Sequence, residues 1–276
     1  MDWDPEFLAR SPMFEPLRAH APAAFGAGWP SLAGLQQLLD RRRPRVSNAA
    51  GVPLRLMAQG RRSRTFEERY EARIFLGGAL QVRERNWHDL LNVLVWLAFP
   101  RAKAALNARH YAALAAQRAA GAPNRGPVQD ALTLFDEGGV IVASCDHELL
   151  DCLRGWRWKE LFWSRRARLP ARMRFHLFGH ALYEKALQPF LGITGRGIVL
   201  TAGPDLLGAP LSEQLAVLDA ALAAHLSDPA KLAATRELEV VPVLGVPGWH
   251  ARNGNELFYD DTDYFRPARS REKRES

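Results

Sequence analysis

Two histidines and a glutamate in the second half of the chain are spaced so that a helix would place them on one face. His176, His180 and Glu184 occur in RFHLFGHALYEK, and helical residues four apart lie side by side. Two imidazoles one turn apart can bind one metal ion, and a carboxylate can complete the site or orient a ligating histidine. The sequence therefore predicts a divalent transition metal at these three residues. The pattern lacks the general base of HExxH, which excludes a metalloprotease of that type. The alternative, that the three are hydrogen-bonded structural residues, stays open.

A second group of chemically active residues lies on either side of the apolar run 90–99. His88 and Asp89 precede the run, and Asn107 and His110 follow it. A metal ion beside a histidine that activates water is an effective hydrolytic arrangement, so these four are candidate catalytic residues. Their order resembles that of His-Asn-His nucleases, which carry the first histidine on a strand rather than at the start of a helix. The alternative is that Asp89 caps the helix and Asn107 binds neighbouring backbone.

Both groups depend on helices to bring their members together. The apolar run predicts a helix over residues 87–99, which Pro100 must end or kink because proline lacks an amide hydrogen and clashes with the preceding turn. An alanine-rich helix over 101–119 should follow. A long helix is expected over 170–187, with a proline at its first position, and an amphipathic helix over 211–226.

Glycine turns between apolar segments predict short strands and hairpins. Residues 70–76 and 79–82 flank one pair of glycines. Residues 131–135 and 140–144 flank the turn 136–139, whose sequence DEGG is favourable for a hairpin. In this interpretation Asp136 and Glu137 serve the turn. We expect a helix-dominated α+β fold in a single domain, with short strands and hairpins.

Composition predicts one globular body with two unlike ends. The chain has 276 residues, 47% of them hydrophobic and 24% charged, which is ordinary for a globular protein. Residues 1–30 are rich in proline and aromatic side chains and should form an arm packed on the body. Residues 31–267 should form the globular domain, and residues 268–276 a basic disordered tail.

The charge of the chain is compatible with an anionic partner. The net charge is +7 and the sequence pI is about 9.8. Arginine-rich segments at 41–43, at 61–64 and in the C-terminal tail supply most of the excess. Nucleic acid or another anionic partner would suit them. Heavy arginine and alanine usage also follows from a GC-rich genome, so we give such a partner less weight.

The cysteines and the N-terminus predict a cytoplasmic location. Cys145 and Cys152 form neither a CxxC motif nor a disulfide framework. The N-terminus lacks the basic start and apolar core of a signal peptide. The longest apolar run is about half the length that crosses a bilayer, so no membrane span is expected.

Four long segments carry a family resemblance. In chain order they are RNWHDLLNVLVWLAFPRAKAALNARH, RGPVQDALTLFDEGGVIV, FGHALYEK and FYDDTDYFRP. Together they resemble a bacterial family known as domain of unknown function 3025, over most of the chain up to Pro267. The resemblance implies a single-domain bacterial protein and carries no activity with it.

Three functions remain open, and we favour the first. A metal-dependent hydrolase would act on phosphodiester or other anionic substrates, with His176, His180 and Glu184 holding the metal and His88 and Asp89 adding a ligand or base. A non-enzymatic binding protein would contact nucleic acid or an acidic protein partner through its arginines. In the third, the polar residues fasten the helical core to the N-terminal arm, and the partner is another protein. The sequence does not decide between an enzyme and a binding protein.

Overall fold

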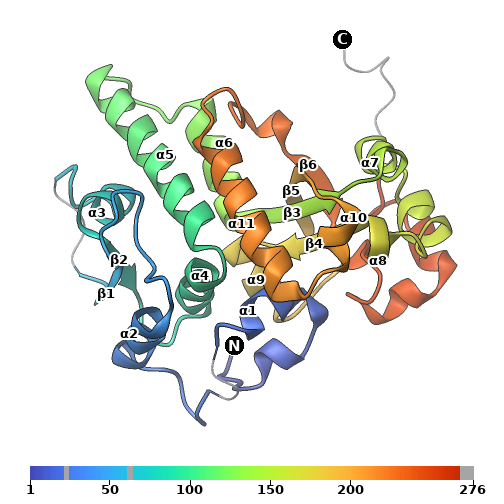
Figure 1. The fold of residues 1–276 in the computed structure, drawn as a ribbon, viewed down its shortest axis with the longest axis horizontal. Helices are drawn as coiled ribbons and strands as arrows, with labels where there is room; N and C mark the ends of the chain where they lie inside the picture. The colour runs from blue at the N-terminus through green and yellow to red at the C-terminus, as the bar shows by residue number, and fades with distance from the viewer. Residues whose placement is uncertain (22–24, 61–64, 268–276) are drawn as a thin grey trace.

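A four-stranded mixed sheet lies at the centre of the molecule. The computed structural model describes residues 1–21, 25–60 and 65–267 (Figure 1). In spatial order the strands are β4 (Met173–Leu177), β3 (Gly139–Ser144), β5 (Thr194–Thr201) and β6 (Glu239–Pro242). Strand β3 is parallel to β5 and antiparallel to β4, and β6 is antiparallel to β5. Every residue of β3 is buried, as expected for a central strand covered on both faces.

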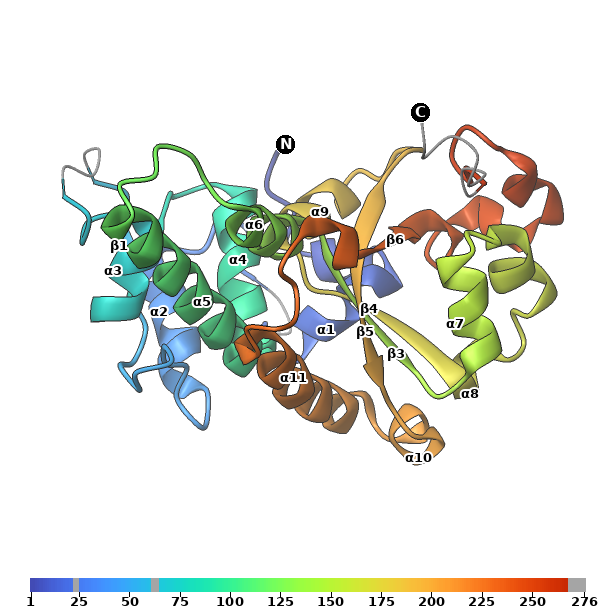
Figure 2. The same cartoon turned by 90° about the horizontal axis from the view of Figure 1, so that it is seen from above.

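Helices cover both sides of this sheet (Figure 2). On one side lie α4 (Trp87–Ala98), α5 (Pro100–Ala119), α6 (Pro127–Gly138) and α11 (Leu211–Ser227). On the other lie α7 (His147–Arg154) and the helical turn Glu160–Ser164. A small parallel pair, β1 (Arg55–Ala58) and β2 (Ala79–Val82), lies near α2 (Leu32–Arg41) and α3 (Tyr70–Gly77). The predicted helix-dominated α+β single domain is confirmed.

The helix break at Pro100 is confirmed. Helix α4 ends at Ala98, and proline occupies the first position of α5. Residues 90–98 are all buried, which explains the unbroken apolar run. The start of α5 receives its cap from a distant helix, because the Asp219 carboxylate of α11 accepts the backbone N–H groups of Arg101 (3.1 Å) and Ala102 (2.8 Å). Burial raises the pKa of this carboxyl to about 6.

Two predicted strands are wrong. Residues 70–76 belong to helix α3, which ends at Gly78 with a left-handed φ of 65°. Residues 131–135 belong to helix α6, whose apolar side chains at 128, 131, 132 and 135 follow the helical period. The expected hairpin is therefore a helix followed directly by β3. At the junction, a Cβ on Gly139 would meet the Phe135 carbonyl oxygen at 2.4 Å.

The long helix predicted over 170–187 is also wrong. This segment forms α8 (Leu169–Arg172), β4 and α9 (His180–Ala186). Pairing with β3 overrides the local helical pattern, and places His176 opposite Ile141 in the antiparallel register. The backbone N–H groups of Phe178 and Gly179 both donate to the Gly139 carbonyl at 2.9 Å. His176 and His180 therefore lie on different elements.

The N-terminal segment packs on α4 and α9 through aromatic rings. It contains the 3-10 helices Phe7–Ala9 and Pro12–Phe14 and the helix α1 (Glu15–Arg18). The Trp3 ring stacks on Trp87 with centroids 5.2 Å apart, and Phe14 stacks on Tyr183 at 5.7 Å. Phe7 and Phe14 are fully buried, so this segment contributes to the core.

The remaining helices are short, and they lie between β5 and β6 or after β6 in the chain. They are α10 (Pro204–Gly208) and the 3-10 helices Thr235–Glu237, Val243–Gly245, Ala251–Gly254 and Glu256–Asp260. Cys145 and Cys152 are free thiols. Across the described residues, no helix has the length and apolar character needed to span a membrane. The predicted basic tail, 268–276, and the arginine-rich segment 61–64 lie outside the described residues.

Candidate metal centre

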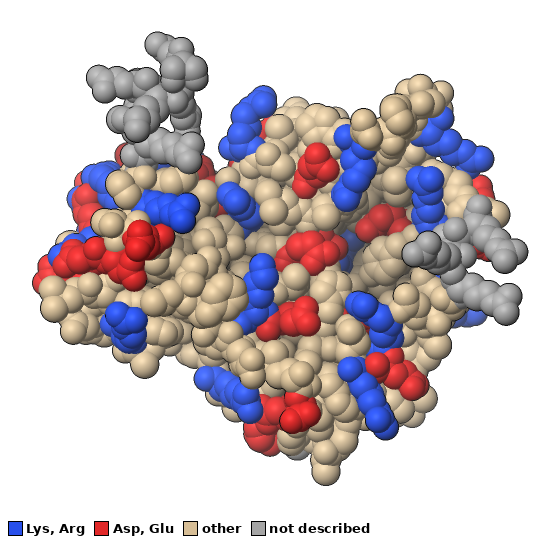
Figure 3. Space-filling view, turned by 180° about the vertical axis from the view of Figure 1, so that it is seen from behind, with Lys and Arg blue, Asp and Glu red and all other residues tan. Residues whose placement is uncertain are grey.

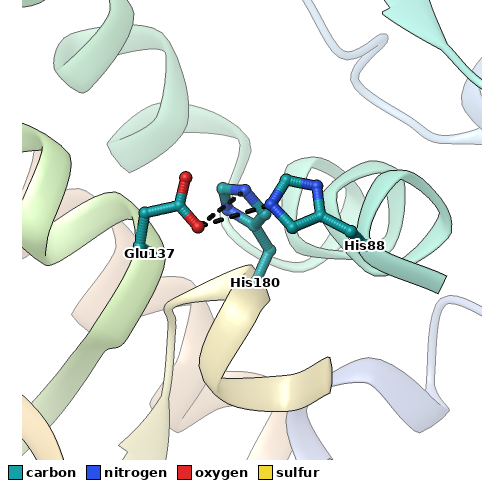
Figure 4. A group of neighbouring side chains, drawn as sticks. All are labelled: His88, Glu137 and His180. Carbon is teal, nitrogen blue, oxygen red and sulfur yellow. Dashed lines mark hydrogen bonds and ion pairs between the residues drawn. The ribbon is translucent and has the colours of Figure 1, made fainter. Parts of the chain in front are cut away.

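Two histidines and a glutamate from three helices meet in one cluster (Figure 4). The Nε2 atom of His88 lies 3.4 Å from Oε2 of Glu137, and Nε2 of His180 lies 3.5 Å from the same oxygen. One potential ligand atom from each residue lies within 4.8 Å of the other two. His180 is buried, whereas His88 and Glu137 are partly exposed. The cluster therefore combines metal-ligating atoms with access from solvent.

Each member of the cluster lies at the end of a helix. His88 is the second residue of α4, whose first turn is fixed by the Asn86 side chain accepting the backbone N–H of Asp89. Glu137 is the penultimate residue of α6, and His180 is the first residue of α9. Gly179 lets α9 start directly against α6, because a Cβ there would meet the Glu137 carbonyl oxygen at 2.4 Å.

A carboxylate lies on the Nδ1 side of each histidine. For His88 it is Asp89, at 3.1 Å. For His180 it is Asp136, at the longer distance of 3.9 Å. These carboxylates are held in turn, Asp89 by Arg83 (2.8 Å) and Asp136 by Lys103 (2.5 Å). The Asp89 contact to His88 is within hydrogen-bond distance and is the support that metal-ligating histidines generally have. The Asp136 carboxylate is too far from His180 for a hydrogen bond and acts on it through its charge.

The two imidazoles differ in protonation. Hydrogen bonds to Asp89 and Glu137 raise the pKa of His88 to about 9. Burial lowers the pKa of His180 to about 4, although the Asp136 carboxylate opposes this shift. His180 is therefore neutral at pH 7, as a metal ligand must be. His88 carries a proton that a metal would displace.

The neighbouring acids are ionised. Burial would raise the pKa of Asp136, but the positive charge of Lys103 outweighs it and holds the pKa below its usual value. The same opposition applies to Glu137, where burial is outweighed by the His88 hydrogen bond and the nearby His180. An ionised Glu137 supplies the negative charge that a divalent cation requires.

A cavity of about 290 Å³ opens beside the cluster. Its wall includes Tyr70, Glu71 and His110 together with the three cluster residues. Burial raises the pKa of Glu71, so this carboxyl exchanges a proton closer to neutral pH than an exposed glutamate does. The Asn107 amide donates to its Oε2 at 2.6 Å and to its backbone oxygen at 3.0 Å, which fixes the side chain at the cavity.

The cluster overlaps the sequence predictions in part. Of the predicted catalytic residues, His88 belongs to the cluster, Asp89 supports it, His110 lines the cavity and Asn107 holds Glu71. The structure thus brings these four to one region.

Of the three predicted metal ligands, His180 alone belongs to the cluster among the described residues. His176 lies on β4 and lines a different cavity, because the strand replaces the expected helix. Glu184 lies on α9, one turn beyond the cluster's His180. No continuous helix runs from His176 to Glu184, so the three residues do not share one helical face.

Glu137 was missed as a site residue because it was assigned to a hairpin turn. The sequence nevertheless contains a signal for a helix that includes Glu137. Pro127 stands at a favourable first helical position, and the apolar residues after it follow the helical period. Read this way, Asp136 and Glu137 fall in the last turn of a helix. Nothing in the local sequence indicates that this turn meets His88.

Both distances from a histidine nitrogen to the Glu137 oxygen match the ligand spacing of a tetrahedral metal. Zn–N and Zn–O bonds of about 2.0–2.1 Å imply about 3.3–3.4 Å between neighbouring tetrahedral ligands, against about 2.9 Å for octahedral ones. The two distances to Glu137 Oε2, 3.4 and 3.5 Å, match the tetrahedral value. Two histidines, one carboxylate and a position open to a cavity are the ligand set of several catalytic zinc sites.

The residues of this centre lie within a region shared by a family of proteins. A family model described as a protein of unknown function, DUF3025, matches residues 54–269. The chain belongs to the DUF3025 family. The matched range of this DUF3025 protein includes His88, Glu137 and His180, and the aromatic N-terminal segment precedes it. No curated protein and no solved structure matches the chain.

The described surface of the DUF3025 protein lends no support to a nucleic-acid partner. Figure 3 shows one face of the molecule, on which basic and acidic side chains are interspersed. Binding of a polyanion is favoured by a broad basic surface, which this face does not have.

Proposed function

We propose that the protein is a metal-dependent hydrolase whose divalent transition metal, with zinc as first choice, is held by His88, Glu137 and His180. The observation that carries the proposal is the convergence of both Nε2 atoms on one Glu137 oxygen, at 3.4 and 3.5 Å. A structural cluster would not need carboxylates behind both histidines, nor a cavity in front of them.

The chain's own residues supply the other parts of a hydrolytic site. When bound, the metal acts as a Lewis acid and lowers the pKa of a water molecule. Asp89 orients the His88 imidazole through a hydrogen bond, and Asp136 supplies negative charge on the Nδ1 side of His180. Glu71 lines the same cavity with a raised pKa, and Asn107 holds its carboxyl group. Glu71 is therefore our candidate for accepting and returning the proton during hydrolysis.

The proposed substrates are phosphodiesters or other anionic esters. The arginine and lysine nearest the cluster, Arg83 and Lys103, each bind an aspartate. Their charge is thus largely compensated, and the metal would be the positive group that faces a substrate. A compact anionic group that binds a metal directly fits such a cavity.

Metal analysis of purified variants tests the proposal. We expect the wild-type protein to contain about one equivalent of metal after exposure to zinc, and Glu137→Gln and His180→Ala to lose it. Glu184→Gln is the matched control, since it removes a glutamate on α9 outside the cluster. Circular dichroism would establish that the variants fold. A folded wild-type protein that binds neither zinc, manganese nor iron would refute the site, as would full metal content in His180→Ala.

Activity is tested on the same proteins. We expect zinc-loaded protein to hydrolyse bis(p-nitrophenyl) phosphate or p-nitrophenyl phosphate, and Glu71→Gln to lose most of this activity while retaining metal. Equal activity of wild type and Glu137→Gln would show that hydrolysis does not depend on the centre.

A further inference from the structure

A second cavity is lined by three side chains that each bury a polar atom without a partner. Among the described residues, no hydrogen-bond partner exists for Nε of Arg174, Nε2 of His176 or Oε1 of Gln214. Unpaired buried polar atoms are costly, and folded proteins contain few of them. Three such atoms in the wall of one cavity show that this wall has hydrogen-bonding capacity which the described residues do not use.

This cavity is separate from the metal centre and large enough for a small molecule. Its volume is about 570 Å³, within the range of roughly 300–1,000 Å³ that is usual for ligand sites. It is bounded by α1, α8, β4, the start of α11 and the segment 246–249, and it shares no lining residue with the metal cavity.

Among the described residues, no carboxylate forms an ion pair with the arginines of the lining. Arg18 donates through Nε to the Leu8 carbonyl at 2.8 Å, and Arg166 donates through Nη1 to the Asn253 carbonyl at 3.3 Å. Backbone carbonyls hold these guanidinium groups in place but do not neutralise their positive charge. With Arg174 the lining has three arginines against one acidic residue, Glu15. An anion is therefore the favoured ligand.

The same lining is apolar elsewhere. Phe175, Leu169, Val246 and Trp249 contribute to it. A cavity with charged groups on one part of its wall and aromatic and aliphatic groups on another suits a molecule with an anionic head and an apolar body.

Two neutral polar groups complete the wall. The Gln214 amide nitrogen donates to the carbonyls of Leu207 (3.2 Å) and Ala209 (2.7 Å), which fixes the orientation of its Oε1 acceptor. His176 lies two residues from Arg174 on β4, so both project from one face of the strand. Burial, with the charge of Arg174, lowers the pKa of His176 to about 4 and keeps it neutral.

We propose that this cavity binds a small amphipathic anion, whose carboxylate or phosphate group lies against the arginines and whose apolar body packs on Phe175 and Trp249. Oriented guanidinium groups and an adjoining apolar wall are what such a ligand requires. The proposal stands independently of the metal centre.

Fluorescence titration with anilinonaphthalene sulfonate, an aromatic anion, tests the site. We expect saturable binding to wild-type protein and displacement by octanoate or octyl phosphate, the stronger competitor identifying the preferred head group. Octanol has the same chain without a charge and should compete at least tenfold more weakly. Arg174→Gln should weaken probe binding at least tenfold, the effect of losing one charge-assisted contact. Arg172→Gln, which removes an equal charge outside the cavity, should bind as wild type does.

A cavity-filling variant keeps the test decisive if Arg174→Gln fails to fold. Ala209 lines the cavity, and Ala209→Trp should abolish probe binding while thermal unfolding remains cooperative. Absence of saturable binding to the wild-type protein would overturn the proposal. So would undiminished binding in folded Ala209→Trp, or equal competition by octanol and octanoate.

Discussion

Replacing His176 with glutamine should remove a specific part of the protein's acid sensitivity. Burial holds the pKa of His176 at about 4 in the folded chain, against 6.5 as its ordinary value. Because the unfolded chain binds the proton first, the wild-type protein loses stability as the pH falls below 6.5. The loss of unfolding free energy caused by His176 is negligible at pH 7.5, about 1.4 kcal/mol at pH 5.5 and about 3 kcal/mol at pH 4. Glutamine does not titrate, so His176→Gln should lack this loss.

Urea unfolding of both proteins between pH 7.5 and pH 5.5 measures the effect. As the pH falls from 7.5 to 5.5, the unfolding free energy of the variant should rise by about 1.4 kcal/mol relative to that of the wild type. Other titrating groups affect both proteins equally and cancel in this comparison. Parallel pH profiles would refute the assignment of His176 as a buried neutral residue. The variant should also retain its metal, which separates its role from that of His180. Loss of metal would instead favour the ligand set expected from the sequence.

Two further substitutions test how the metal centre is assembled. A Cβ at Gly179 would lie 2.4 Å from both the Glu137 carbonyl oxygen and the Gly139 nitrogen, so Gly179→Ala should destabilise the fold by about 1–3 kcal/mol and reduce zinc retention. Gly203→Ala meets no such neighbour and should unfold at the wild-type temperature in the same thermal scan. Asp136→Asn should weaken zinc binding roughly 10–100-fold in a chelator competition, because the Nδ1 side of the histidine loses its charged partner. Unchanged affinity would show that Asp136 serves Lys103 alone.

Short-range sequence patterns were sufficient to predict helices α4, α5 and α11, of which α4 carries His88. Pro100 divides α4 from α5 because the effects of proline act within one turn. The helix over 211–226 was likewise predictable from its own period. Strand β4 was not, because it exists through pairing with β3, about thirty residues earlier in the chain. A segment that reads as helix in isolation becomes a strand once that partner is available.

The site escaped prediction for a related reason. His88 and Asp89 are adjacent in the sequence, so their pairing could be inferred directly. Glu137 and His180 are brought to them by the packing of α6 and α9, and no window of sequence contains all of these residues. Periodicity therefore indicated His180 as a candidate ligand, and the fold places it beside His88 and Glu137 rather than beside His176.

The position of Gly179 links the architecture of the chain to the proposed chemistry. Its backbone nitrogen donates to Gly139 at the start of the central strand, and its missing side chain lets α9 begin against the end of α6. The next residue is His180, which faces Glu137 as a result. The contact that ends the pairing of β3 with β4 thus also sets the distance between two proposed ligands. Disturbing this junction should alter stability and metal binding together, whereas Glu137→Gln should alter metal binding with little effect on the fold.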